Sequence, residues 1–184
     1  RVVFKHEGLE QKLQYDPNSR KSLLDHFYDT DVSLEAIADG LGVDRGDFVE
    51  SAYDARLRRN PDRIQAQMTR TGLACNKTVQ ITKGVSLQAG SSSLEIAYLL
   101  EGLPTDHDLH FGIEFNFSGL PAGAEDRYFY SGDLDRLGQL QTRLDLENVL
   151  TIGMVDEWLG INLKLTTKSD PEKWLCKMGN VTRK

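Results

Sequence analysis

Two stretches near the middle of the chain, residues 94–100 and 110–117, alternate between apolar and polar side chains. A period of two, with β-branched and aromatic residues at the apolar positions, indicates strands that bury one face. The other face of the second stretch carries His110, Glu114 and Asn116. One face is therefore expected to build a core, and the other offers hydrogen-bonding groups and a carboxylate. The apolar positions are Leu94, Ile96, Tyr98, Leu100, Phe111, Ile113, Phe115 and Phe117.

The same alternation predicts strands over most of the chain after residue 48. The turn signal Asn60-Pro61-Asp62 separates the first two, and a polar loop is expected over 132–138. Because the strands follow one another at near-regular intervals, they favour an antiparallel structure over a parallel βαβ sheet. The further strands are predicted at residues 2–4, 48–59, 63–71, 77–87, 127–130 (a short edge strand), 141–150, 150–156, 159–165 and around Trp174.

Helical spacing is confined to the first quarter of the chain. Apolar residues stand at that spacing within 19–28, and a second short helix is expected over 34–41 with Ser33 as its N-cap. The fold class that follows is mainly β: an antiparallel β-sandwich with short N-terminal helices. We expect one domain over the whole chain, with a partly helical lead of residues 1–47 and a sandwich of residues 48–184.

Composition and charge place the chain among globular proteins. Its 184 residues are 39% hydrophobic and 27% charged, enough for a sizeable core. The net charge of -6 and the lack of a long basic block predict neither a nucleic-acid nor a membrane partner. The sequence opens at Arg1 without a signal peptide, so we expect a piece of a longer polypeptide. Cys75 and Cys176 lack metal-ligand spacing, and we expect free thiols in a cytoplasmic protein.

The polar face of the 110–117 strand is the first candidate binding site. Glu114 and Asn116 project to the same side of the strand, about 7 Å apart. With His110 they could hydrogen-bond the hydroxyls of a sugar or hold a partner loop, although an ordinary solvent-exposed sheet face has the same pattern. The preceding loop, residues 106–108, lacks the helical ligand spacing of zinc hydrolases, so no metal site is predicted.

Trp158 is the second candidate. The apolar residues of the predicted strand 159–165 alternate from Leu159, which puts Trp158 on the opposite face. A tryptophan there has to be covered by the N-terminal helices, by a partner domain or by a sugar ring stacked on it. No nucleophile elbow, phosphate-binding loop or Cys/His pair occurs, and no pair of acidic residues stands out. Neither a catalytic residue nor a cofactor is therefore predicted.

A series of motifs in fixed order resembles a known family. The lead EGLEQKLQYDPNSRKSLLDHF (residues 7–27) is followed by GDFVESAYDA, KTVQITKGVSL, LEIAYLL, HFGIEFNF, RYFY and VDEWLGINLKL. Together they are similar to the C-terminal domain of glycoside hydrolase family 57 enzymes, in the branch of α-amylases and 4-α-glucanotransferases. The similarity covers nearly the whole chain. The end departs from it, because LCKMGNVTRK follows Trp174 where the family has a Pro-containing segment rich in Thr, Ser and Glu.

The resemblance implies a β-sandwich of the galactose-mutarotase-like supersandwich type. In that family the sandwich packs against a distorted (β/α) barrel that carries the catalytic nucleophile and acid, so no catalytic residue is transferred to this chain. The resemblance also implies that residues of the lead motif lie at the boundary with that barrel. The candidates are Tyr15, Asp16, Arg20, Asp25 and His26.

Three functions stay open on the sequence. The first is a non-catalytic accessory domain of an α-glucan-acting enzyme, which supports the barrel and could contact glucan. The second is a stand-alone mutarotase-like sugar enzyme that uses His110 and Glu114 as acid and base. The third is a purely structural interaction domain, which would be favoured if Trp158 and Tyr130 both proved to be buried.

Overall fold

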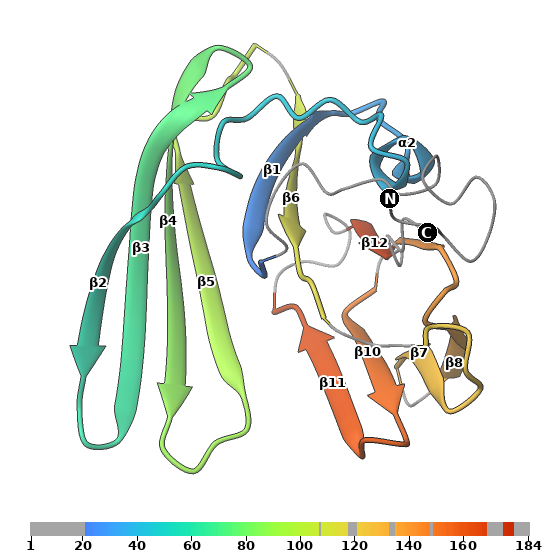
Figure 1. The fold of residues 1–184 in the computed structure, drawn as a ribbon. Helices are drawn as coiled ribbons and strands as arrows, with labels where there is room; N and C mark the ends of the chain where they lie inside the picture. The colour runs from blue at the N-terminus through green and yellow to red at the C-terminus, as the bar shows by residue number, and fades with distance from the viewer. Residues whose placement is uncertain are drawn as a thin grey trace, which may run out of the picture. The chain divides into compact units, whose positions relative to one another are not determined.

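The computed structural model describes residues 21–106, 108–117, 121–132, 135–147, 149–168 and 175–178. Within these residues the strands pair antiparallel throughout, and a single short helix accompanies them (Figure 1). The mainly β, antiparallel sandwich class is therefore confirmed. The described residues form two compact units: unit 1 comprises those within 33–41 and 117–184, and unit 2 comprises those within 21–32 and 42–116. Each unit has its own hydrophobic core.

The larger sheet of unit 2 has four strands in the order β2-β3-β4-β5. Their bounds are Asp54–Arg59, Arg63–Ala74, Lys77–Gln88 and Leu94–Glu101. The predicted turn at Asn60 is confirmed, since its N–H donates to the carbonyl of Arg63 at 2.8 Å. Cys75 and Asn76 join β3 to β4 with φ of 48° and 62°, the left-handed backbone of a two-residue hairpin turn.

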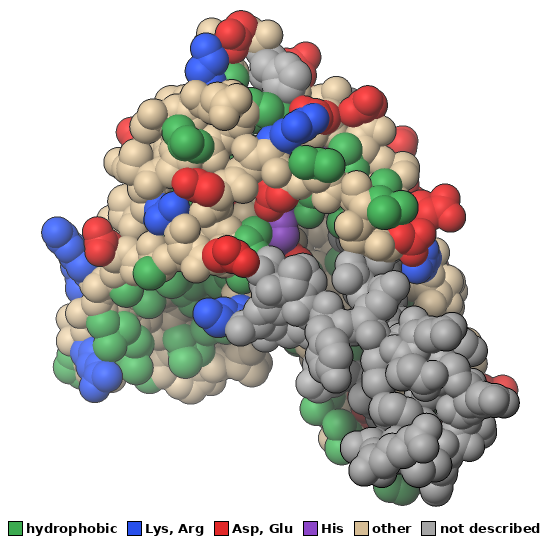
Figure 2. All heavy atoms as spheres, turned by 45° about the horizontal axis from the view of Figure 1, so that its top comes forward, with side chains coloured by type: hydrophobic (Ala, Val, Ile, Leu, Met, Phe, Trp, Pro, Cys, Tyr) green, Lys and Arg blue, Asp and Glu red, His purple; other side chains and the backbone are tan. Residues whose placement is uncertain are grey.

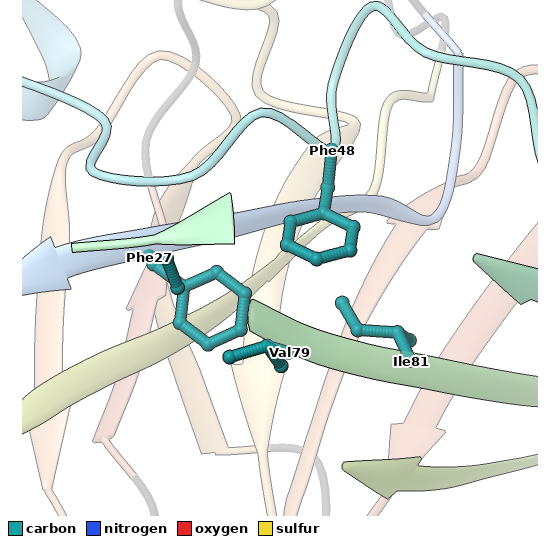
Figure 3. Packing of buried hydrophobic residues seen from close by; sticks show 5 residues of the cluster. Phe27, Phe48, Val79 and Ile81 are labelled. Carbon is teal, nitrogen blue, oxygen red and sulfur yellow. The ribbon is translucent and has the colours of Figure 1, made fainter. Parts of the chain in front are cut away.

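The second layer of unit 2 is a two-stranded ribbon of β1 (Leu24–Asp29) and β6 (Leu109–Glu114). The ribbon packs on the large sheet through a core that Phe27 and Phe48 share with Val79 and Ile81 (Figure 3). The rings of Phe27 and Phe48 lie 5.5 Å apart between centroids. Gly72 leaves the space that the Phe48 ring occupies, because a Cβ there would lie 2.9 Å from that ring.

The predicted helix over residues 19–28 is wrong where the structure describes it, because residues 24–29 form strand β1. Asp25 and Phe27 point into the core, and Leu24, His26 and Tyr28 point to the other side. An alternation is present, but its inward positions include a carboxylate and its outward positions include a leucine. The hydrophobicity pattern alone therefore predicts a helix for this segment. The segment forms a strand because it pairs with β6.

The inner face of the large sheet, which faces the ribbon, is mostly apolar, although Lys83 on β4 and Arg70 on β3 also lie on it. The ribbon covers only one end, at Val79, Ile81 and Leu100. The other end exposes four large aliphatic side chains on this face, of which three are neighbours in register across β3, β4 and β5, while Leu57 on β2 pairs with Ala66. We call them the aliphatic face: Leu57, Ile64, Leu87 and Leu94. Figure 2 shows hydrophobic side chains gathered at its lower left, on the side where the large sheet lies.

Unit 1 contains a second four-stranded sheet, in the order β11-β10-β7-β8. The bounds of these strands are Ile161–Thr166, Thr151–Asp156, Arg127–Ser131 and Asp135–Gln139. Tyr130 lies directly over Gly153, its partner on β10, and its hydroxyl donates to Asn162 at 2.7 Å. Arg127 and Asp156 form a buried ion pair on the opposite side of the same strand pair, at 2.8 Å.

Strand β8 occupies most of the segment that was predicted as a polar loop over 132–138, so that prediction is wrong. Its pairing also makes β7 an inner strand rather than an edge strand. A register shift between Phe129 and Tyr130 accompanies the pairing. β8 exposes Asp135 and Arg136 and contains Gly138, so its sequence shows no apolar alternation; pairing with β7 holds it.

The helix α2 (Leu34–Ala38) confirms the second predicted helix, although it is shorter. The Ser33 side chain accepts a hydrogen bond from the N–H of Ala36 at 3.1 Å, as an N-cap does. Gly40, with φ of 72°, ends the helix. Two of the other predicted strands start late or end early: the first of the large sheet begins at Asp54 rather than at residue 48, and β6 ends at Glu114.

The last predicted strands are found as β9 (Leu144–Glu147) and β12 (Leu175–Met178), which pair with each other. The predicted strand at residues 2–4 and Trp174 lie outside the described residues. The expectation of one domain over residues 1–184 stays a prediction.

Candidate functional site

Polar side chains gather on the outward side of the β1–β6 ribbon of unit 2. We call this group the His26 cluster: His26, Tyr28, Asp44, Glu114 and Asn116. Cross-strand pairing places Glu114 beside Leu24 and sets Gly112 opposite His26. Gly112 has no side chain, so the imidazole can lie across β6 towards Glu114. The sequence prediction that Glu114 shares a polar face with His110 is confirmed by this register.

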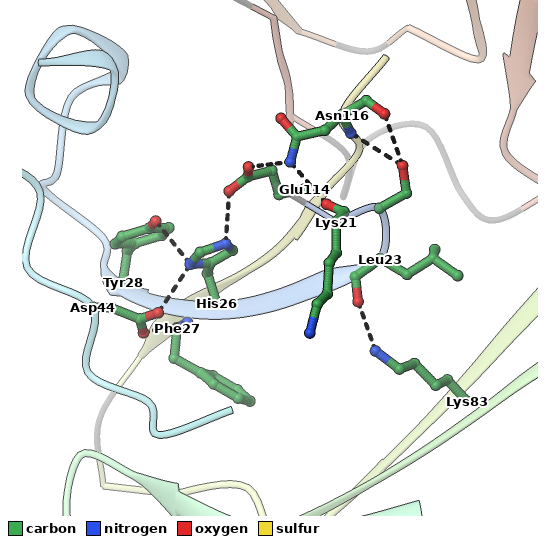
Figure 4. Close-up of polar contacts among 10 residues, drawn as sticks. Lys21, Leu23, His26, Phe27, Tyr28, Asp44, Lys83, Glu114 and Asn116 are labelled. Carbon is green, nitrogen blue, oxygen red and sulfur yellow. Dashed lines mark hydrogen bonds and ion pairs between the residues drawn. The ribbon is translucent and has the colours of Figure 1, made fainter. Parts of the chain in front are cut away.

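The imidazole of His26 lies between two carboxylates (Figure 4). Its Nδ1 is 2.9 Å from Oδ2 of Asp44, and its Nε2 is 3.0 Å from Oε2 of Glu114. The ring stacks on Tyr28 with 5.5 Å between centroids and 10° between the planes. The Tyr28 hydroxyl lies 3.1 Å from Nδ1. Every polar atom of the imidazole therefore has a partner.

Each carboxylate is itself held by the backbone or by a neighbouring side chain. Asp44 Oδ1 accepts hydrogen bonds from the N–H groups of Phe27 at 3.1 Å and Gly46 at 2.8 Å. The Asn116 amide donates to Glu114 and, at 2.8 Å, to the carbonyl of Lys21. The cluster thus connects β1, β6 and the loop that follows the helix in sequence.

The charge state of His26 follows from these contacts. Burial by itself lowers the pKa of His26, but the hydrogen bonds to Asp44 and Glu114 and the charges of both carboxylates raise it, to about 9. At neutral pH the ring is an imidazolium that donates from both nitrogens. Burial and the same two negative charges raise the pKa of the Tyr28 hydroxyl well above its usual range.

This arrangement suits structural support better than acid–base catalysis. A protonated His26 cannot accept a proton at neutral pH, and Glu114 already accepts from His26 and Asn116. His110 and Glu114 are four residues apart on one strand, roughly 13 Å along it. The geometry does not favour their acting together on one anomeric carbon.

A second polar cluster lies on the inward side of β1, where sequence reasoning did not place one. The Asp25 carboxylate contacts Lys83 Nζ at 2.6 Å and accepts from the hydroxyls of Tyr53 at 2.5 Å and Tyr98 at 2.9 Å. Lys83 also donates to the carbonyl of Leu23 at 2.6 Å, and its ammonium lies 4.2 Å from the Tyr53 ring centroid. Burial, together with the Asp25 carboxylate, raises the pKa of both tyrosines.

One signal in the sequence could have revealed this second cluster. On β4 the inward positions run Val79, Ile81, Lys83 and Val85, so a lysine interrupts an apolar series. A buried lysine needs an anion, and Asp25 is the carboxylate that the fold supplies. The side chain of Asp25 is fully buried. The predicted role of Asp25 and His26 at a domain boundary stays a prediction, and Tyr15, Asp16 and Arg20 lie outside the described residues.

The remaining candidates belong to other parts of the chain. In unit 1, Trp158 stands on the turn between β10 and β11 and is 79% exposed, whereas Tyr130 is buried. The condition set for a purely structural domain, that both be buried, is therefore not met. Asp106 lies 3.3 Å from Lys77, and His107 lies outside the described residues. No group of three or more potential metal ligands, and no helix able to span a membrane, occurs in the described part of the chain.

The comparison with known families decides what kind of domain this is. The family model of the α-amylase/4-α-glucanotransferase C-terminal domain matches residues 1–183. The chain belongs to this family. Its membership confirms the resemblance that the ordered motifs indicated, and it agrees with the absence of catalytic geometry in the His26 cluster.

Curated relatives of this α-amylase/4-α-glucanotransferase C-terminal domain are much longer proteins. An α-amylase 1 of Dictyoglomus thermophilum is 26% identical over 135 residues, which are 72% of this chain and 19% of that protein. An α-amylase of Pyrococcus abyssi is 27% identical over 112 residues, which are 61% of this chain and 16% of that protein. The matches thus span less than a fifth of either relative.

Among solved structures, the 4-α-glucanotransferase of Thermococcus litoralis matches 95% of this chain and 26% of its own, with a TM-score of 0.49 and 17% identity.

Proposed function

We propose that this domain is the non-catalytic sandwich of an α-glucan-acting enzyme of glycoside hydrolase family 57, and that it supports the catalytic barrel of the same cytoplasmic polypeptide. The match over residues 1–183 is the observation that carries the proposal. The motif order supports family 57 and a sandwich of the galactose-mutarotase-like supersandwich type. The hydrogen-bonded His26 cluster, which offers no available general base, supports a role without catalysis.

The aliphatic face of unit 2 is the surface best suited to that support. Four aliphatic side chains adjoin there on one face of a rigid sheet, and none of them is buried. Covering each one would contribute roughly 1 kcal/mol, because each is already partly removed from water. The relatives extend far beyond the matched segment, so a catalytic barrel in the same polypeptide is the occupant we propose.

Paired substitutions in the complete polypeptide test this surface. Ile64 and Leu73 lie on β3 with the same exposed fraction, 46%, but Ile64 belongs to the aliphatic face and Leu73 points to the opposite side of the sheet. We expect Ile64→Gln to lower the temperature at which α-glucan activity is lost, and Leu73→Gln to leave it unchanged. In the isolated domain the two variants should unfold alike. Equal inactivation temperatures in the complete polypeptide would contradict the proposed contact.

Glucan contact is the second role that an observation favours. Trp158 presents an exposed indole on a turn, and sugar rings stack on such side chains. His110, Glu114 and Asn116 stay further candidates in unit 2. Because the chain has two tryptophans, Trp158 and Trp174, a Trp174→Phe variant would report on Trp158 alone. Its fluorescence should change on titration with maltohexaose, and an unchanged spectrum at millimolar sugar would exclude stacking.

A further inference from the structure

The outer face of the large sheet in unit 2, opposite the core, contains a hollow that includes no residue of the His26 cluster. It has a volume of about 300 Å³ and lies over Gly84 in the middle of β4. In register, Gly84 faces Gln67 on β3 and Ala97 on β5. A Cβ built on Gly84 would meet no atom within 4 Å. Gly84 and Ala97, two small residues side by side, thus form the floor of what we call the Gly84 hollow.

Two arginines of the edge strand β2 line one side of the Gly84 hollow. Arg56 pairs with Gln67 and Arg58 pairs with Gln65, so both lie on the same side of the sheet and about 7 Å apart along β2. Both arginines are exposed. No ion pair within the described residues holds either guanidinium, whereas Arg45 and Arg70 of the same unit are each paired with an aspartate.

The other groups around the hollow are uncharged, and they include both polar side chains and the apolar residues Ala66, Ala97 and Leu99. Gln65 donates from its amide to the hydroxyl of Ser86 at 3.2 Å, and Gln67 and Thr82 add a further amide and hydroxyl. No acidic side chain lines the hollow, which does not suit a metal ion or an amine. Paired guanidinium groups suit an oxyanion, and amides with hydroxyls suit the hydroxyls of a sugar.

We propose that the Gly84 hollow binds a phosphorylated monosaccharide. The phosphate lies between Arg56 and Arg58, and the sugar hydroxyls exchange hydrogen bonds with Gln65, Gln67 and Ser86. The volume is at the lower end of the range for small-molecule sites, which fits one sugar ring with its phosphate. Because the hollow is open and both arginines are exposed, the affinity is modest and weakens with salt. This site does not depend on the proposed support of a catalytic barrel.

Calorimetric titration of the domain at low salt tests the proposal with three ligands: glucose 6-phosphate, glucose and inorganic phosphate. We expect glucose 6-phosphate to bind at least tenfold more tightly than either of the other two. Equal binding of phosphate would show a site for anions only, and equal binding of glucose would show a neutral sugar site. Either result, or no binding of glucose 6-phosphate, would overturn the proposal.

Three variants locate the binding. Arg56→Gln combined with Arg58→Gln removes the proposed phosphate contacts, and Gly84→Val fills the floor without changing charge. Each should weaken glucose 6-phosphate binding at least tenfold. Arg59→Gln is the matched control, because Arg59 lies on the same strand but points to the other face, and it should leave binding unchanged. If the Gly84→Val variant does not fold, the double arginine variant and the Arg59→Gln control still test the site. An equal loss of glucose 6-phosphate affinity in these two variants would overturn the assignment.

Discussion

Asp25 and His26 are neighbours on β1, yet their side chains lie on opposite sides of the strand. Asp25 is buried with Lys83 and two tyrosine hydroxyls, and His26 lies between two carboxylates on the outward side. In both places a charge is matched by an opposite charge and by hydrogen bonds. Such pairing is what makes the burial of ionic groups tolerable, but it leaves each partner dependent on the other.

Removal of one partner of the buried pair should therefore be costly. Lys83→Met leaves the Asp25 carboxylate in the core without its cation, and we expect the free energy of unfolding to fall by about 3–5 kcal/mol. Urea denaturation measures this loss. The double variant Lys83→Met with Asp25→Leu should be less destabilised than the single one, because no unpaired charge remains. A single variant within 1 kcal/mol of the native protein would contradict a buried ion pair.

The stability of unit 2 should depend on pH through His26. Its pKa is raised from 6.5 to about 9 in the folded state, so the stabilisation is fully present below pH 6.5 and is lost as the pH rises through about 9. The loss should be on the order of 2–3 kcal/mol, measured by urea denaturation across this range. Glu114→Gln should lower the His26 pKa in an NMR titration, and Glu157→Gln, in unit 1, should not. A His26 pKa near 6.5 in the native protein would contradict the prediction.

At the scale of elements, strands with a long apolar alternation were predicted well from the sequence, and β4 was found although Lys83 interrupts its apolar series. β3, β4 and β5 alternate over seven or more residues, and a strong turn signal separates β2 from β3. Prediction failed at β1, where pairing with the distant strand β6 decides, and at β8, which is held by pairing with its neighbour β7. The buried Asp25 interrupts the series of apolar residues on the inward side of β1, and β8 contains no apolar series.

The pairing of β7 with β10 depends on the absence of a side chain at Gly153. A Cβ there would overlap the Tyr130 ring, so Gly153→Ala should displace the ring and break its hydrogen bond with Asn162. We expect a loss of about 1–3 kcal/mol in the free energy of unfolding. Gly84→Ala is the matched control on another inner strand, because open space surrounds the added methyl group. If both variants lose the same amount, the close contact of Tyr130 with Gly153 does not explain the loss.

The candidate site was predicted only in part, for a related reason. The sequence placed Glu114 and Asn116 on one polar face, and it singled out His26 through a family motif. It gave no sign that these residues would meet Asp44, which lies 18 residues from His26 along the chain. The Lys83 pairing spans 58 residues. Periodicity describes one strand at a time, and such contacts appear only when strands and loops are assembled.

At the scale of the whole molecule, the segments of this chain that match its curated relatives span 19% and 16% of the length of those proteins. The structure describes two compact units rich in strands, and the His26 cluster within them holds a loop against a ribbon. Its acid and base groups are engaged with each other rather than available to a substrate. Bond cleavage or transfer is therefore assigned, in our proposal, to the rest of a longer polypeptide.

The most direct test measures the products formed from maltoheptaose by the isolated domain and by the complete polypeptide at equal molar concentration. The account predicts shorter or rearranged glucans from the complete polypeptide and none from the isolated domain, even after long incubation. Cleavage or transfer by the isolated domain, abolished by Glu114→Gln, would contradict the account.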